Sequence, residues 1–434
     1  MKFLSSITTT IVSLFVMAAP HTHAQQFVPN SPMGEAKGIY PGRVTFIHNK
    51  DAARWDGTTG HWWDEGNIDT EILDGMYDKS LCGLTGSKSP KDAWKNIFTY
   101  YNKNNSRGKR GYKAGETIVI KVNLNNTFDT NDRDNEIDQS PQATCAILRQ
   151  LIEFAKVPEE CIVVYDATLS WKARAIPDRI YAPAHSRYPK VRWMSANGSE
   201  GVEAADWVED AITYTDPTVA LGSKLPKAVV EADYLINLSL LKGHEITGVT
   251  AGAKNHFGSI QFPARMHDTP TVNQRNGKYG DYSALVDLMG CPNLGKKTVL
   301  HIVDGLYGMQ TNVGAPNPQR DKWKTFGNQW SSCYLMSLDP VAIECVCLDF
   351  LYAEFGDKLG FSGARQFPEG SSKHCDNYLM EAARGTNDKF GEYRPNGTAT
   401  GSLGVFEHWN NPQERKYSRN MGKKEGIELF TIGF

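Results

Sequence analysis

Four basic residues with regular spacing follow a strongly apolar stretch of the chain, and their types suit an anion or metal site. The stretch Leu235–Leu241 leads into Lys242 and His244, and Lys254 and His256 each follow twelve residues after these. Small side chains let the backbone approach a ligand closely. We therefore expect a pocket floor made by the small residues between the two pairs, which are Gly248, Ala251 and Gly252.

Acid/base chemistry next to a carboxylate is the first hypothesis for these residues. An unperturbed histidine has a pKa of ~6.5, which suits a general base near neutral pH, and His244 is the candidate. Lys254 and Lys121 would hold the substrate carboxylate, because a cation must stabilise the charge that develops when the neighbouring proton leaves. Asp304 would orient the base. The expected catalytic residues are thus His244, Lys254 and Asp304, and the expected anion-binding residues are Lys121, Asn123, Lys242 and Asn255.

A metal site built from histidines is the alternative. His244, His256 and His267 could ligate one divalent transition metal, because imidazole suits zinc, copper, iron and nickel. The nearby lysines would repel such an ion unless Asp304 or Asp268 lies between them. His256 and His267 are the residues expected to serve as ligands, and the identity of any cofactor stays open. No C-x-x-C pattern occurs, so an iron–sulfur cluster is not expected.

Apolar strands separated by helices must position these residues. Apolar and β-branched runs predict strands at Arg43–His48, Thr117–Leu124, Ile162–Ala167, Lys190–Ser195, Ala232–Leu241, Thr298–Val303 and Tyr334–Leu338. Helical spacing and capping residues followed by proline predict helices at Lys91–Asn102, Pro141–Lys156, Tyr282–Met289 and Pro340–Phe355. Because the strands are apolar throughout, the predicted fold class is α/β: a mostly parallel sheet covered by helices on both faces, with long decorated loops.

Polar residues fall at the ends of five of these strands, which is where ligands bind in parallel sheets. They are Lys121 and Asn123, Asp166, Lys242 and His244, Asp304, and Asp339. Any single aspartate there can be a cap or a turn former, and a single histidine can simply bond to the backbone. Together these residues predict one pocket at this edge of the sheet.

The ends and the composition of the chain define its broad class. Lys2, the apolar run Ile11–Ala19 and Thr22-His23-Ala24 predict a signal peptide over residues 1–24, and hence a periplasmic or secreted protein. Residues 25–434 are expected to form one large α/β domain, with a core at about 111–356 and an irregular C-terminal extension at 361–434. Without Lys2 the chain has 46 basic and 49 acidic residues and no basic stripe, so nucleic acid is not an expected partner. No later run approaches the ~18 apolar residues of a membrane span, and the oligomeric state is undefined.

Several blocks of sequence match a known family in order. They are KVNL at 121–124, the helix start Ser140-Pro141, INLSLLKGH at 236–244, AGAKNHFGSI at 251–260, VDGLYGM at 303–309 and SLDPVAIE at 337–344. As a set they resemble the uncharacterised family called "domain of unknown function 362", over roughly residues 117–356. The family name implies no activity. Some members carry ferredoxin-type cysteine runs, which this chain lacks, so the resemblance does not imply electron transfer here.

His244, Gly248, Gly252 and Lys254 are also similar, over about 25 residues, to a segment of the lactate racemase family. In that family the histidine acts in acid/base transfer, a lysine ten positions later holds a nickel-pincer nucleotide, and a further histidine binds the metal. The resemblance implies the first two roles for His244 and Lys254. It places His267 close to the metal-binding histidine but off register.

These observations predict an exported enzyme that acts on an anionic small molecule, a sugar acid or a glycan fragment, as a lyase, epimerase or racemase. Two other functions stay open: a non-catalytic binding protein for an anionic ligand, and a metal-dependent enzyme. Trp62 and Trp63, beside His61, Asp64 and Glu65, are a candidate surface for stacking on a sugar. Both indoles could equally fill the edge of the core.

Overall fold

The computed structural model describes residues 31–125, 135–167, 182–198, 201–218, 222–244, 247–261, 282–356, 376–410 and 413–433. The predicted signal peptide at 1–24 and the predicted metal ligand His267 lie outside these ranges. Within them, no helix is both long enough and apolar enough to cross a membrane.

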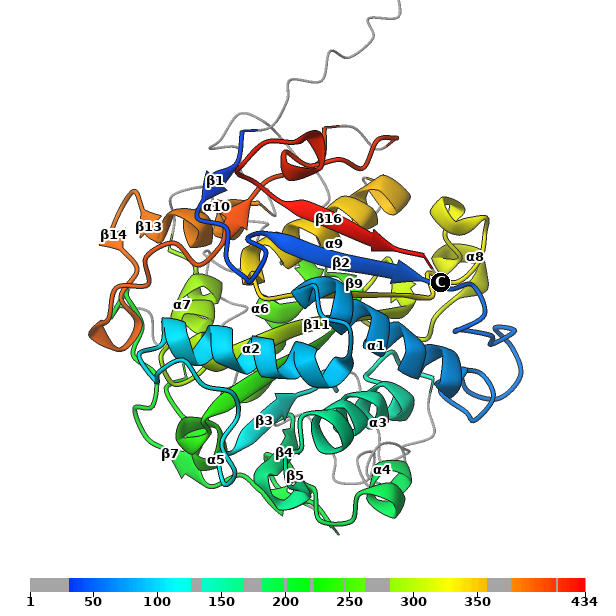
Figure 1. Cartoon of the computed structure of the whole chain (residues 1–434), viewed down its shortest axis with the longest axis horizontal. Coiled ribbons are helices and arrows are strands. Elements are labelled where there is room, and N and C mark those ends of the chain that lie inside the picture. The colour runs from blue at the N-terminus through cyan, green and yellow to red at the C-terminus, as the bar shows by residue number, and fades with distance from the viewer. Residues whose placement is uncertain are drawn as a thin grey trace, which may run out of the picture.

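A mostly parallel sheet forms the centre of the protein (Figure 1). Its strands are β2 (Arg43–His48), β3 (Ile118–Lys121), β4 (Ile162–Tyr165), β5 (Arg192–Ser195), β6 (Glu203–Ala204), β9 (Tyr234–His244), β10 (Gly248–Thr250), β11 (Thr298–Met309), β12 (Cys333–Ser337) and β16 (Glu428–Ile432). The order is β16-β2-β12-β11-β9-β3-β4-β5-β6, and β10 pairs with β9. In this sheet β12 and β10 run antiparallel to their neighbours, and the other pairs are parallel. The predicted fold class is confirmed.

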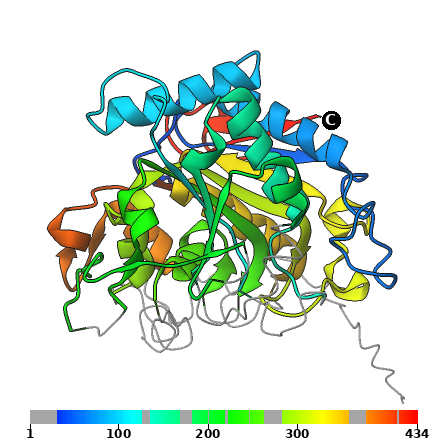
Figure 2. The same ribbon diagram turned by 90° about the horizontal axis from the view of Figure 1, so that it is seen from below.

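Helices cover both faces of the sheet (Figure 2). One face carries α1 (Thr70–Thr85), α2 (Pro90–Asn104), α3 (Pro141–Arg149) and α4 (Ala182–Arg187), drawn in blue to green in Figure 2. The other face carries α5 (Lys227–Glu231), α6 (Gly252–Asn255), α7 (Ala284–Gly290), α9 (Pro340–Phe355) and α10 (Asn377–Arg384). The short α8 (Pro318–Asp321) contacts β11. Three two-stranded ribbons complete the described strands: β1 (Met33–Gly34) with β15 (Val405–Phe406), β7 (Trp207–Val208) with β8 (Leu225–Pro226), and β13 (Thr386–Asn387) with β14 (Gly391–Glu392).

Each face of the sheet buries its own apolar core, which explains why the strands are apolar throughout. In β4, Ile162 and Val164 pack on the α1–α3 side, whereas Val163 and Tyr165 pack on the α6–α9 side. Adjacent side chains of a strand point to opposite faces. A strand with helices on both sides therefore shows no polar alternation in its sequence, and odd or even position along it decides which layer a side chain enters.

Side-chain caps begin several helices where the sequence predicts them. Ser89 and Ser140 each accept a hydrogen bond from the backbone N–H three residues ahead, and proline follows each of them. Asp339 caps α9 in the same way. The helix predicted at 141–156 is shorter in the structure than in the prediction. It ends as α3 at Arg149, and a π-helical turn follows over Gln150–Phe154.

The C-terminal extension at 361–434, which the sequence predicts to be irregular, contains a helix and strands. The helix α10 packs against α7 and α9, and β16 forms the edge of the sheet beside β2. Figure 1 shows β16 in red next to β2 in blue. Arg43 of β2 donates to both carboxylate oxygens of Glu428 in β16, at 2.8 and 3.0 Å. The first long strand of the chain and its last strand are therefore neighbours.

Candidate functional site

The ends of three parallel strands and one short helix bring the basic residues to the carboxyl edge of the sheet. β3 ends at Lys121, Asp166 follows β4, and β9 ends at His244. Gly248 has a φ of +89°, which a glycine adopts readily, and starts β10 back along β9. The helix α6 then returns over the sheet and carries Lys254 to the same edge.

These side chains line one small cavity, which we call the lysine cavity. Its wall contains eight polar residues, together with Phe257 and Gly258; the polar residues are Lys121, Asn123, Asn125, Asp166, His244, Thr250, Lys254 and Asn255. Its volume is about 30 Å³, above the ~10–15 Å³ that a cavity needs to hold one water molecule. The lysine cavity therefore has room for a ligand head group of about the size of a carboxylate.

A fully buried ion pair anchors the lysine cavity. Lys121 Nζ lies 3.0 Å from Asp166 Oδ2, and the two side chains are 0 % and 2 % exposed. The same ammonium donates to the side-chain oxygen of Asn255 at 3.0 Å and to the carbonyl oxygen of Val122. Asp166 also accepts a hydrogen bond from the backbone N–H of Leu124 at 3.0 Å. Burial lowers the pKa of Lys121, and the carboxylate of Asp166 opposes that shift.

Asn255 connects the lysine cavity to the sheet. Its Oδ1 accepts from Lys121 and Asn123, each at 3.0 Å, and its Nδ2 donates to Asn237 Oδ1 at 2.8 Å. Asn123 in turn accepts a hydrogen bond from Lys242 Nζ at 3.3 Å. Lys242 therefore acts on the cavity through Asn123, and its own side chain lies behind the lining.

Burial, and to a lesser extent neighbouring positive charge, lowers the pKa of Lys254 and Lys242. Burial, together with the charges of Lys242 and Lys121, lowers the pKa of Lys254 to about 7. Burial lowers the pKa of Lys242 to about 8, and Asp138 opposes that shift. Lys254 Nζ lies 4.0 Å from the centre of the Phe257 ring, a cation–π contact. At neutral pH a large fraction of Lys254 is therefore a neutral amine that can accept a proton.

The two histidines of the expected site have different surroundings. His244 lines the lysine cavity, and its Nδ1 accepts a hydrogen bond from the backbone N–H of Thr247 at 3.3 Å. His256 is not part of that lining, and its Nε2 lies 3.2 Å from Asn237 Nδ2 in a buried layer. Burial and the nearby His301 lower the pKa of His256 to about 3, so its ring is neutral.

Only two of the three histidines expected as metal ligands, His244 and His256, lie in the described residues. In the part of the chain that the structure describes, no three His, Cys, Asp or Glu side chains are arranged to hold a metal ion. His256 is separated from the lysine cavity and His244, and His267 lies outside the described residues.

A buried polar layer under α6 fixes this helix against the sheet. Glu344 of α9 accepts a hydrogen bond from the backbone N–H of Ala253 at 2.7 Å, and Asn237 Nδ2 donates to the carbonyl oxygen of Gly252 at 2.8 Å. A Cβ at Gly252 would lie only 3.3 to 3.4 Å from polar atoms of this layer. Gly252 therefore allows close packing under α6, and it is not the cavity floor that the sequence predicts.

Asp304 requires a correction, because the structure places it on the opposite face of the sheet. Asp304 pairs with Leu240 of β9, whereas Lys121 pairs with Asn237 of the same strand. Positions 237 and 240 differ by an odd number, so the two aligned side chains leave the sheet on opposite sides. There Asp304 accepts a hydrogen bond from Gln139 Nε2 at 2.8 Å, and burial raises its pKa to about 6.

Comparison with known families adds one finding to this geometry. Residues 118–349 match the model of a family described as a domain of unknown function, DUF362. The match covers 232 of the 434 residues. The chain belongs to the DUF362 family. A search of curated proteins finds no match, and the local similarity to lactate racemase has no support beyond the residue spacing.

Every residue that lines the lysine cavity falls within the DUF362 segment. Asp166, which the sequence predicts only as part of the strand-end pocket, lines the cavity and pairs with Lys121. Asn237, which the sequence analysis does not name, lies outside the lining and supports Asn255. Asn237 carries a signal that could have found it, since a polar side chain inside a strand buried on both faces needs a partner. Asp339, by contrast, lies away from the cavity and accepts hydrogen bonds from the backbone N–H groups of Lys37 and Val405.

Substitution of Gly258 by alanine is expected to disrupt the lysine cavity of this DUF362 protein. A Cβ at this position would clash with the Asp166 carboxylate and lie 2.6 Å from Lys121 Nζ. We expect Gly258→Ala to weaken binding of acetate at least tenfold and to lower the free energy of unfolding by about 1–3 kcal/mol. Calorimetric titration and urea unfolding measure the two effects. Gly111→Ala is the matched control, because its Cβ would meet only Lys95, at 3.9 Å. Unchanged acetate binding in Gly258→Ala would contradict the anion site.

Proposed function

We propose that this protein is an enzyme that moves a proton at the carbon next to the carboxylate of a small anionic substrate, such as a sugar acid. The observation that carries the proposal is Lys254, a buried lysine with a pKa of about 7 in the same cavity as the ion-paired Lys121. A site with this excess of positive charge favours an anion and disfavours a divalent metal.

In the proposed reaction the neutral amine of Lys254 takes the proton. The substrate C–H bond breaks, an N–H bond forms on Lys254, and the electron pair moves onto the carboxylate to give an enediolate. Lys121, held by Asp166 and Asn255, stabilises the new charge. This stabilisation is needed because a proton next to a carboxylate is only weakly acidic.

His244 is the second acid/base group of the proposal. Because its Nδ1 accepts from the backbone N–H of Thr247, the neutral ring carries its proton on Nε2. An epimerase or racemase needs one group to take a proton and another to return it, and a lyase needs an acid for its leaving group. The sequence hypothesis gave the base role to His244, whereas the lowered pKa of Lys254 supports the amine in that role.

Capture of an anion without turnover is the second candidate function, and the size of the lysine cavity favours it. A volume of about 30 Å³ fits a carboxylate head group with little room for a reacting substrate. Such a binding protein needs the lysines but no titrating base. For either function, the pattern of residues 1–24 supports a periplasmic or secreted protein.

Exchange of hydrogen for deuterium tests the proposal without knowledge of the natural substrate. The protein is incubated in D₂O with a panel of 2-hydroxy acids and hexuronic acids, and NMR follows the loss of the proton signal next to the carboxylate. Lys254→Met should lower the exchange rate by about 10²–10⁴-fold, the usual contribution of a general base. At saturating acid the rate of the unmodified protein should rise with pH, with a midpoint above the pKa of about 7 of the free protein, because the bound carboxylate favours the charged form of Lys254.

Lys227→Met is the matched control, because it removes a half-exposed lysine of α5 that lies outside the lysine cavity. It should leave the exchange rate unchanged. Full exchange by Lys254→Met would overturn the assignment of the base. Stoichiometric binding of these acids without exchange would support the binding protein instead.

A further inference from the structure

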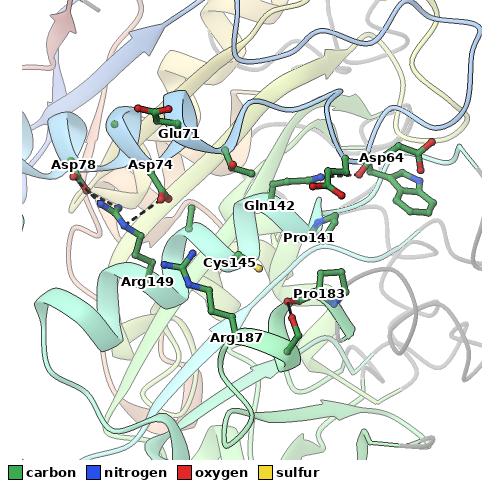
Figure 3. A pocket seen from close by; sticks show the side chains of 16 residues that line it. Asp64, Glu71, Asp74, Asp78, Pro141, Gln142, Cys145, Arg149, Pro183 and Arg187 are labelled. Atoms are coloured by element: carbon green, nitrogen blue, oxygen red, sulfur yellow. Dashed lines mark hydrogen bonds and ion pairs between the residues drawn. The ribbon is translucent and has the colours of Figure 1, made fainter.

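A second and much larger cavity lies on the other side of the sheet, beside α1, α3 and α4 (Figure 3). Its volume is about 910 Å³, which is within the ~300–1,000 Å³ typical of small-molecule sites. It shares no lining residue with the lysine cavity. We call it the acidic cavity after the five carboxylates that line it: Asp64, Glu65, Glu71, Asp74 and Asp78.

The acidic cavity has a net negative lining. Two arginines, Arg149 and Arg187, also line it, which leaves three more negative than positive charges. Both guanidinium groups already have partners: Arg149 lies 3.2 Å from Asp74 and 3.0 Å from Asp78, and Arg187 lies 2.8 Å from Glu153. Figure 3 shows Arg149 in this ion pair at one end of the cavity, with Asp64 at the other end. Asp64 also has a partner, since its carboxylate lies 3.2 Å from His61 Nδ1. The exposed Glu65 and Glu71 have no ion pair in the described part of the chain, so their charge can attract a cation.

Trp63 and Gln142 give the Asp64 end of the cavity features that suit an amine. Trp63 lines the cavity, and an indole ring is the strongest aromatic partner for a cation. Gln142 Nε2 donates to the carbonyl oxygen of Trp63 at 2.9 Å, while Gln142 Oε1 is buried and has no hydrogen-bond partner in the described part of the chain. An acceptor without a donor costs free energy, and an ammonium group supplies N–H donors.

The half-buried carboxylate of Asp74 also supports a cation in this cavity. Burial raises its pKa above the usual range, although Arg149 lies beside it. The ion pair with Arg149 therefore does not fully offset the loss of water around this carboxylate, and a second cation would help to keep it ionised.

We propose that the acidic cavity binds a small organic cation of the amine or diamine class. One ammonium group would lie at the end of the cavity formed by Trp63 and Gln142, and the second ammonium group of a diamine would lie near Glu71 and Asp74. The lysine cavity attracts the opposite charge, so this second site is independent of the proposed enzyme function.

Calorimetric titration of the full chain with 1,4-diaminobutane and 1,4-butanediol tests the proposal, because the two probes share a length and differ in charge. The diamine should bind at least tenfold more tightly than the neutral diol. Glu71→Gln should weaken diamine binding about threefold to tenfold, and Trp63→Leu about twofold to thirtyfold, the range expected for a lost cation–π contact. The exposed Glu71 is the safer variant if loss of the buried Trp63 disturbs folding.

Glu231→Gln removes the same charge from an exposed position on α5 and is the matched control. It should leave the affinity for the diamine unchanged. Equal binding of diamine and diol would overturn the proposal in favour of a site for neutral polyols. An equal loss of affinity in Glu231→Gln and Glu71→Gln would overturn it as general charge attraction, and so would no binding of the diamine up to about 10 mM.

Discussion

Replacement of Asp166 by asparagine is expected to lower the free energy of unfolding by about 3–5 kcal/mol, the cost of leaving one charge of a buried pair without its partner. The Lys121 side chain is 0 % exposed and lies 3.0 Å from Asp166, so its ammonium cannot reach water when the carboxylate is removed. Urea unfolding followed by circular dichroism at pH 7 measures the change.

A double substitution and a surface variant control this experiment. Lys121→Met combined with Asp166→Leu should recover most of the lost stability, because neither charge then has to be buried. Glu203→Gln breaks the exposed pair with Arg192, at 2.7 Å, and should cost about 1 kcal/mol or less. If Asp166→Asn cost no more than this surface variant, the central ion pair would not be isolated from water.

Binding of acetate to the lysine cavity is expected to weaken by roughly 10- to 100-fold between pH 6 and pH 9, because the charge-assisted hydrogen bond from Lys254, worth ~1.5–3 kcal/mol, and the charge of Lys242 behind Asn123 are both lost. The pKa of Lys254 is about 7 and that of Lys242 about 8, so both are mostly charged at the lower pH and mostly neutral at the higher. Acetate itself stays ionised over this range. Calorimetric titration at constant ionic strength measures the affinity.

Single variants separate the two lysines. Lys254→Met should remove the part of the decline centred near pH 7, and Lys242→Met the part near pH 8. In the absence of acetate, the free energy of unfolding of the unmodified protein should rise with pH when it is compared with that of Lys254→Met. The unfolded chain keeps its lysine protons to about pH 10.5, so folding becomes more favourable as the pH rises from 7 towards that value. An acetate affinity that does not change between pH 6 and pH 9 would contradict the lowered pKa values.

The elements of the fold can be predicted from the sequence because their signals are local. Ser140 and Asp339, each followed by proline, begin helices through hydrogen bonds to the next few residues. Apolar, β-branched runs mark the strands of the sheet. The rule that ligands bind at the carboxyl ends of parallel strands then places Lys121 and His244 at one cavity.

The face that a side chain enters is not encoded locally in this sheet. Helices cover both sides of β11, so its sequence lacks the polar alternation that would show which way Asp304 points. Only the register of β11 against β9 separates Asp304 from Lys121. The pKa of Lys254 is equally non-local, because it depends on burial and on lysines 12 and 133 residues away in the chain.

The pairing of β16 with β2 determines when the protein can finish folding during synthesis. Arg43 and Glu428, which bond across these strands, are 385 residues apart. At the usual elongation rate of ~5–20 residues per second, the ribosome makes β16 about 20 to 80 s after β2. The other neighbour of β2, β12, is also made late, at residues 333–337. Until β12 is made, β2 has neither of its neighbours on the nascent chain and is open to contact with other molecules. Completion of the central sheet therefore has to wait until β16 has been synthesised.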